Sequence, residues 1–184
     1  MIKGFDCSDN NDINWQTLSP DFQFVLVKKS EGAGYTDKDY AYRSEHLPVT
    51  DLAVGYYHFM KPGDSVQSQL DNYFNGLTEN DLPPILDAEV PGITPTMVTA
   101  WLAGAQQKSG RKPILYCDPG FYKDNLQSTQ FDCHYWIAAW QPEPPHIPWT
   151  IWQYSQYGTQ QGAETGGDLD LDYFDGTVEE LKAI

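Results

Sequence analysis

The sequence predicts an α/β fold, a flattened and irregular (β/α) barrel with eight strands and few helices in its C-terminal third. Short apolar runs alternate with helical stretches as far as about residue 130, which is typical of parallel strands joined by crossovers. Prolines then interrupt the chain between 142 and 148 and exclude regular helices there. Polar side chains follow most of the strands, as expected at the C-terminal rim of a barrel.

The strands are predicted from apolar runs that end in polar residues. Phe24–Val27 is apolar throughout, the pattern of a strand that is buried on both faces. The eight candidates are Ile2–Cys7, Phe24–Val27, Leu52–Phe59, Pro84–Glu89, Pro113–Cys117, Tyr135–Trp140, Thr150–Tyr154 and Leu169–Phe174.

Helices are expected between the early strands. One covers Asp37–His46 and ends before Pro48. A second carries an apolar stripe from Val66 to Leu77, with Asp64 as its expected N-cap. A third begins at the pair Thr94-Pro95 and ends at Gly110, and a short one is expected at Phe121–Leu126.

Composition excludes several classes of partner and site. The length of 184 residues suits one domain. A formal charge of −15 argues against nucleic acid or an anionic membrane as the main partner. No apolar run approaches the roughly 20 residues of a membrane span, and the N-terminus lacks the hydrophobic region of a signal peptide. The 3 cysteines fit no zinc motif, so reduced thiols and no metal or cofactor are expected.

The central feature is the acid pair Asp87 and Glu89. Their i, i+2 spacing directs both side chains to one face of a strand, about 6.6 Å apart along it. Two carboxyls in one partly dry cleft repel each other, which raises the pKa of one. Cleavage of a glycosidic bond requires one protonated carboxyl and one negative group. We therefore expect Glu89, the longer and outer side chain, to be the acid.

Other rim residues carry simpler interpretations. Glu31 and Asp118 are interpreted as hydrogen-bonding rim residues, and His58 as a hydrogen-bonded barrel histidine. Tyr57, Trp140 and Trp152 could belong to the core, but at least one of them is expected to stack on a sugar ring. Cys7 is expected to be a packed thiol, and Lys29 a surface lysine.

Several motifs occur together in a fixed order, and with them the chain resembles glycoside hydrolase family 25. These Chalaropsis-type lysozymes, or N-acetylmuramidases, are common among phage endolysins. The resemblance extends from residue 4 to residue 177. It rests on the segments Gly4–Ser8, Phe24–Gly32, Gly55–Phe59, Leu86–Glu89, Tyr135–Ala138, Trp152–Ser155 and Leu169–Phe174.

The resemblance implies hydrolysis of the β-1,4 bond between N-acetylmuramic acid and N-acetylglucosamine in peptidoglycan. It implies that Glu89 is the general acid/base and that Asp87 lies beside it. Asp6 and Asp170 correspond to further acids of the catalytic cleft. Asp172 stands where asparagine is usual, which leaves open which acid of that strand faces the cleft.

The remaining rim residues, Tyr57, Glu31, Trp140, Gln153 and Asp118, are candidates for binding the glycan strand. The sequence does not decide whether a carboxylate or the acetamido group of the substrate attacks the sugar carbon. We favour the acetamido group, with Asp87 stabilising the intermediate.

One alternative is a non-catalytic module that binds peptidoglycan or chitooligosaccharides. The other, a zinc-dependent deacetylase or amidase, is disfavoured because the histidines show no ligand spacing. Residues 1–184 are expected to form a single catalytic domain without a separate cell-wall-binding domain. The expected protein is a monomeric phage or prophage endolysin, made in the cytoplasm and released to bacterial peptidoglycan through holins or by lysis.

Overall fold

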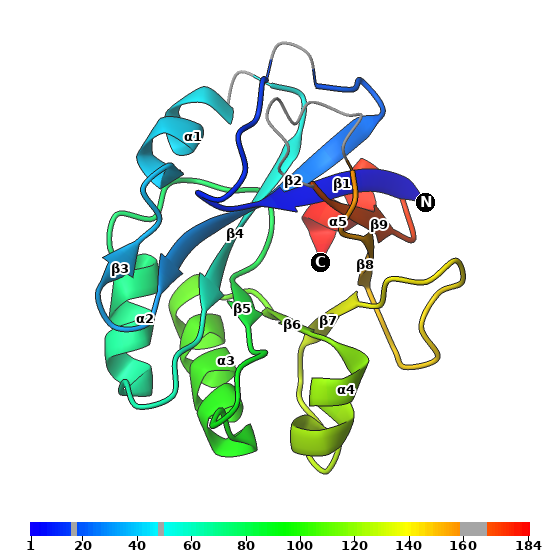
Figure 1. The fold of residues 1–184 in the computed structure, drawn as a ribbon. Helices are drawn as coiled ribbons and strands as arrows, with labels where there is room; N and C mark the ends of the chain where they lie inside the picture. Colours follow the sequence, from blue (N-terminus) through cyan, green and yellow to red (C-terminus); the bar gives the residue numbers. More distant parts are fainter. Residues whose placement is uncertain (16–17, 48–49, 159–168) are drawn as a thin grey trace.

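The computed structural model describes residues 1–15, 18–47, 50–158 and 169–184. In these ranges the strands form one sheet in the order β1-β9-β8-β7-β6-β5-β4-β2-β3, and pairing of β1 with β2 closes it into an eight-stranded barrel with β3 outside (Figure 1). The predicted barrel with few late helices is therefore confirmed. The strands are β1 Ile2–Cys7, β2 Phe22–Glu31, β3 Tyr35–Thr36, β4 Ala53–Phe59, β5 Ile85–Asp87, β6 Ile114–Cys117, β7 His134–Ala138, β8 Ile151–Ser155 and β9 Asp170–Phe174.

Strand β9 runs in the opposite direction to the rest of the barrel. The pairs from β1 through β2, β4, β5, β6 and β7 to β8 are parallel, whereas β9 is antiparallel to both β8 and β1. Asp170, which was expected at the rim near the end of a strand, is the first residue of β9. It reaches the expected rim because the reversed strand pairs Asp170 with Asp6.

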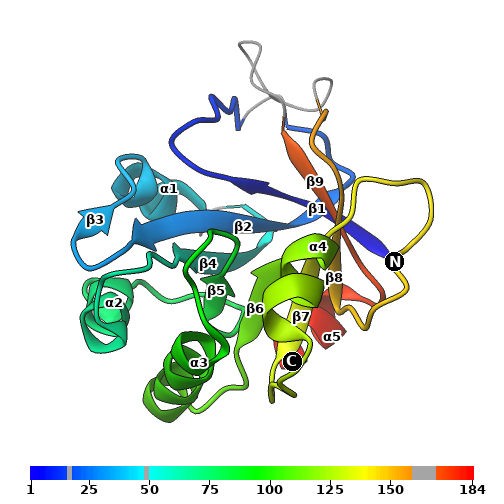
Figure 2. The same cartoon turned by 60° about the horizontal axis from the view of Figure 1, so that its bottom comes forward.

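The helices lie outside the sheet, except α5, whose Leu181 packs into the barrel interior (Figures 1 and 2). Their bounds are α1 Tyr40–His46, α2 Val66–Phe74, α3 Pro95–Ser109, α4 Pro119–Phe121 with a π-helical turn at Tyr122–Leu126, and α5 Val178–Ala183. None of the helices in the described ranges is long and apolar enough to cross a membrane. As predicted, Thr94 is the N-cap of α3, Pro95 is its first residue and Gly110 is its C-cap.

The predicted cap of α2 is wrong. Ser65, not Asp64, is the N-cap, and its hydroxyl accepts a hydrogen bond from the amide of Ser68 at 3.1 Å. The Asp64 carboxylate accepts instead from the amide of Ala33 at 2.9 Å. Helix α5 was not predicted, although Thr177 and Glu180 form a capping box at its start.

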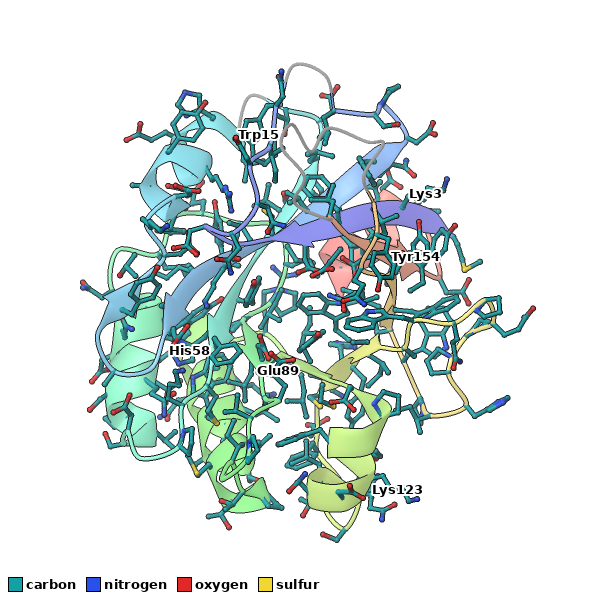
Figure 3. The ribbon with its side chains drawn as sticks, viewed as in Figure 1. Lys3, Trp15, His58, Glu89, Lys123 and Tyr154 are labelled. Carbon is teal, nitrogen blue, oxygen red and sulfur yellow. The ribbon has the colours of Figure 1, made fainter. Side chains whose placement is uncertain are left out.

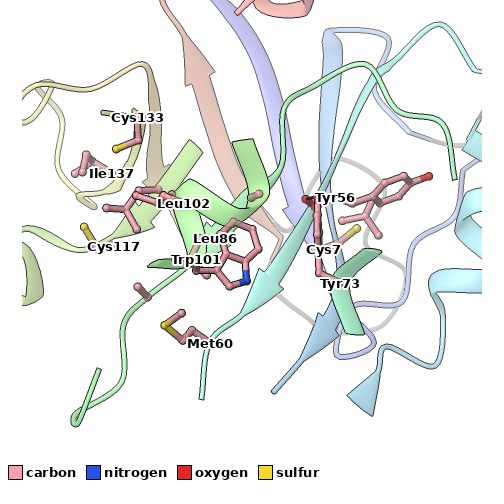
Figure 4. Close-up of a cluster of buried hydrophobic side chains, with 14 of the residues drawn as sticks. Cys7, Tyr56, Met60, Tyr73, Leu86, Trp101, Leu102, Cys117, Cys133 and Ile137 are labelled. Atoms are coloured by element: carbon pink, nitrogen blue, oxygen red, sulfur yellow. Dashed lines mark hydrogen bonds between the residues drawn. The ribbon is translucent and has the colours of Figure 1, made fainter. Parts of the chain in front are cut away.

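Two hydrophobic cores follow from the alternation of side chains along the strands. The outer core lies between sheet and helices and includes Trp101, Leu86 and Ile137 (Figure 4). The inner core fills the barrel with Phe24, Ile85 and other apolar side chains. Since Leu86 and Ala88 pack into the outer core, the side chain between them points into the barrel. This alternation directs Asp87 to the inside.

The outer core also contains polar groups. His58 hydrogen-bonds through Nδ1 to Ser30 Oγ at 2.9 Å and through Nε2 to Gln69 Oε1 at 3.2 Å, which confirms its predicted hydrogen bonding. Burial lowers the pKa of His58 to about 4. All three cysteines are buried and free, so Cys7 is the expected packed thiol.

The prediction of a surface Lys29 is wrong, because helices α1 and α2 cover the outer face of β2. The side chain is 1% exposed. Its ammonium donates to the carbonyl of Asn72 near the end of α2 at 2.8 Å and lies 5.4 Å from the ring centroid of Tyr40. Burial lowers the pKa of Lys29 below its ordinary 10.5.

Because the Lys29 ammonium is buried, the free energy of unfolding changes with pH in the alkaline range. As pH rises through the lowered pKa towards 10.5, the folded chain releases the Lys29 proton before the unfolded chain does. We therefore expect the free energy of unfolding of the wild type to rise over this window relative to that of Lys29→Met. Urea unfolding of both proteins across the alkaline range measures the difference. A difference that does not change with pH would contradict it.

Candidate active site

A cavity of about 180 Å³ opens at the rim where the parallel strands end and β9 begins. The predicted acids Asp6, Asp87, Glu89 and Asp170 all line it, together with Tyr57 and Gln153. Sequence reasoning missed the other lining residues, which are Ser8, Asn10, Lys28, Phe59, Tyr116 and Trp136. Figure 3 shows Glu89 near the middle of the view, beside the end of β5. A larger cavity of about 500 Å³, around Val54 and Asp81, contains none of the predicted acids.

Asp87 lies on the inner side of this cavity. It is the last residue of β5 and is 6% exposed. Its Oδ1 atom is buried and has no hydrogen-bond partner among the described residues. Burial raises the pKa of Asp87 well above its usual value, and the charges of Glu89 and Asp6 raise it further. Asp87 therefore lines the cavity with a carboxyl group of which one oxygen is withdrawn from solvent and has no compensating donor in the described ranges.

Glu89 is the exposed member of the pair. Partial burial raises its pKa, the charge of Asp118 raises it further, and Lys28 lowers it. Burial is thus the main cause that raises the pKa of both acids. The expected repulsion between them is present, since the charge of Glu89 contributes to the raised pKa of Asp87.

Gln153 connects several functional residues from β8. Its Nε2 donates to Asp6 Oδ2 at 2.6 Å. Its Oε1 accepts from Trp140 Nε1 at 3.0 Å and from the Tyr116 hydroxyl at 3.3 Å. Trp140 is 55% exposed, so its ring stands at the rim with its nitrogen held in place. This arrangement leaves the ring available for stacking on a sugar.

Two predicted glycan-binding residues, Glu31 and Asp118, lie outside the cavity lining. The Glu31 carboxylate bridges Lys28 at 2.7 Å and Lys61 at 2.9 Å. Asp118 Oδ1 accepts from the amides of Gly120 and Phe121 and so caps α4. Both are hydrogen-bonding residues near the rim, as expected. Lys28, which directly follows the apolar run of β2, is a cation among the acids of the cavity.

The acid of β9 that faces the cavity is Asp170. Asp172 lies one step deeper in the barrel and is 0% exposed. Its Oδ1 accepts from Trp136 Nε1 at 2.8 Å. Within the part of the chain that the structure describes, no group of three or more His, Cys, Asp and Glu side chains is arranged to hold a metal ion.

Comparison with known proteins agrees with this fold. Residues 5–163 match the model of glycosyl hydrolases family 25. A family 25 glycosyl hydrolase from Bacillus anthracis superimposes with a TM-score of 0.88 at 26% identity, over 100% of this chain and 93% of the other. A bacterial lysozyme from Streptomyces coelicolor gives a TM-score of 0.87 at 26% identity, over 99% and 95%. The protein YegX of Escherichia coli K12 is 30% identical over 200 residues, 100% of this chain and 73% of YegX.

The family match covers most of the sequence, and the structural similarity extends over the whole chain. The chain belongs to glycosyl hydrolases family 25 and is a glycoside hydrolase of the lysozyme type.

Proposed function

We propose that this protein hydrolyses the β-1,4 bond between N-acetylmuramic acid and N-acetylglucosamine in bacterial peptidoglycan. Glu89 is the general acid/base and Asp87 stabilises the intermediate. The observation that carries the proposal is that Asp87, the last residue of β5, and Glu89, two residues beyond the strand, line one cavity together with further acids and aromatic rings. This arrangement supplies the proton donor and the negative charge that glycoside hydrolysis requires.

Substrate binding favours protonation of Glu89 and ionisation of Asp87. Glu89 is exposed in the free protein, so a bound sugar removes more water from Glu89 than from the buried Asp87. Loss of water raises the pKa of Glu89. The Asp87 carboxyl, which lines the cavity, can accept a hydrogen bond from the acetamido N–H, and this bond favours ionised Asp87. The bound state therefore has a protonated Glu89 beside an ionised Asp87.

Hydrolysis then follows in two steps. Glu89 protonates the leaving glycosidic oxygen while the acetamido oxygen of the substrate attacks the sugar carbon. Asp87 holds the acetamido N–H, and the negative potential of Asp6 and Asp170 stabilises the positive charge that develops. Ionised Glu89 next takes a proton from water, and the water oxygen bonds to the sugar carbon while the bond from that carbon to the acetamido oxygen breaks. This step restores the acetamido group and leaves a new reducing end.

The wider setting stays a prediction from the sequence. The endolysin role, release to the cell wall and the monomeric state require separate experiments. A binding module without catalysis would have no use for a buried acid with an unpartnered oxygen beside a second acid, so we favour the enzyme.

Replacement of Glu89 tests the assignment of the acid. Glu89→Gln keeps the size of the side chain but cannot transfer the proton, so we expect its activity to fall by about 10²- to 10⁴-fold. Loss of turbidity of purified peptidoglycan measures this activity.

The matched control is Glu45→Gln, which makes the same change at an exposed site on α1. The control should lyse like the wild type. A folded Glu89→Gln protein that lyses as fast as the control would rule out Glu89 as the acid.

Replacement of Asp118 tests the electrostatics of Glu89. The negative charge of Asp118 raises the pKa of Glu89, and Asp118→Asn removes that charge while its side-chain oxygen can still cap α4. Glu89 must be protonated to act, so a lower pKa ends activity at a lower pH. We expect the alkaline limb of the kcat/KM profile to move to lower pH. An unchanged limb, or one moved upward, would show that Asp118 does not act on Glu89.

A further inference from the structure

Asp172 is a buried carboxyl that the catalytic scheme does not use. It projects into the barrel from β9, below the cavity, and is 0% exposed. Asp172 Oδ1 accepts a hydrogen bond from Trp136 Nε1 at 2.8 Å. The Oδ2 atom is also buried, and none of the described residues provides a donor to it.

The residues around Asp172 explain why Oδ2 has no donor. Its directly opposite residue on β1 is Gly4, which has no side chain. Its opposite residue on β8 is Gln153, whose Nε2 donates to Asp6. The charges that raise the pKa of Asp172 are those of Asp6 of β1 and Asp170 of β9. Tyr154 of β8, whose own pKa is raised in part by the charge of Asp172, is a further titratable neighbour and brings no positive charge.

An ionised Asp172 would therefore be a buried charge beside other negative charges, which is strongly unfavourable. Protonation removes the charge and turns Oδ2 into a hydroxyl donor. Oδ1 is already used as an acceptor by Trp136, so the proton belongs on Oδ2. Burial is the main cause that raises the pKa of both Asp172 and Asp6. The two side chains are close enough that a proton shared between them raises the pKa of Asp172 and lowers that of Asp6.

We propose that Asp172 is a positioning residue, a neutral carboxylic acid at neutral pH whose Oδ2–H donates to Asp6 and holds that carboxylate at the floor of the cavity. Asp6 then has two donors, Gln153 from β8 and Asp172 from β9. The pair shares one proton between two carboxyl groups. Asp172 thus acts through Asp6 and touches no substrate.

Asparagine reproduces this arrangement, because its Oδ1 can accept from Trp136 and its Nδ2 can donate to Asp6. Alanine removes both contacts. The kinetic part of the test rests on the proposed role of the cavity acids, whereas the spectroscopic part measures protonation directly and does not require activity.

The first measurement is the infrared difference spectrum between the wild type and Asp172→Asn at neutral pH. We expect the wild type to show the carbonyl stretch of a protonated carboxylic acid that the variant lacks. Asp175→Asn, which changes an exposed acid just after β9, is the control and should remove no such band. Absence of a protonated-acid band assigned to Asp172 would overturn the proposal, whatever the enzyme activity.

The second measurement compares the pH profiles of kcat/KM for Asp172→Asn and Asp172→Ala. Loss of a hydrogen bond to a charged group corresponds to roughly a tenfold or larger loss of activity, which we expect for alanine, with asparagine restoring most of it. Without its donor Asp6 takes up a proton at higher pH, so the acid limb should move upward in Asp172→Ala but not in Asp172→Asn.

If the Asp172 side chain only filled space, its replacement would change the melting temperature and leave the acid limb of the kcat/KM profile in place. Equal profiles for the two variants would therefore contradict the proposal. If Asp172→Ala does not fold, the infrared comparison of the wild type with Asp172→Asn decides the question alone.

Discussion

The burial of carboxyl groups inside a closed barrel is the constraint on which the rest of this structure depends. Asp6, Asp87, Asp170 and Asp172 project to the inside from β1, β5 and β9, above an interior that is otherwise apolar. Each charge loses much of its hydration there, and the neighbouring charges repel. The acids are tolerated because Gln153 and Trp136 donate hydrogen bonds to Asp6 and Asp172, and because protons neutralise part of the charge.

The same constraint links fold to catalysis. Leu86 and Ala88 anchor β5 in the outer core, so Asp87 is fixed in the cavity by packing on the far side of the strand. Glu89 follows the strand and stays exposed, which makes its pKa responsive to a bound sugar. A buried acid thus ends β5, and an exposed acid follows two residues later.

Much of this arrangement follows from the sequence. The i, i+2 spacing placed Asp87 and Glu89 on one side of a strand, and strand ends identified Asp6, Gln153 and Trp140. Local patterns did not reveal the direction of β9, since reversal depends on which strands it pairs with. The burial of Lys29 was not predicted because α1 and α2 cover β2 through contacts between residues that are far apart in the sequence. The depth of Asp172 depends likewise on the closure of the barrel, which no local pattern contains.

The most direct test of the account is mass spectrometry of purified peptidoglycan after digestion, with the new reducing ends converted to sugar alcohols. Cleavage of the proposed bond predicts fragments that end in reduced N-acetylmuramic acid. The same fragments should be absent after digestion with Glu89→Gln. Fragments that end in reduced N-acetylglucosamine, or intact glycan strands, would contradict the account.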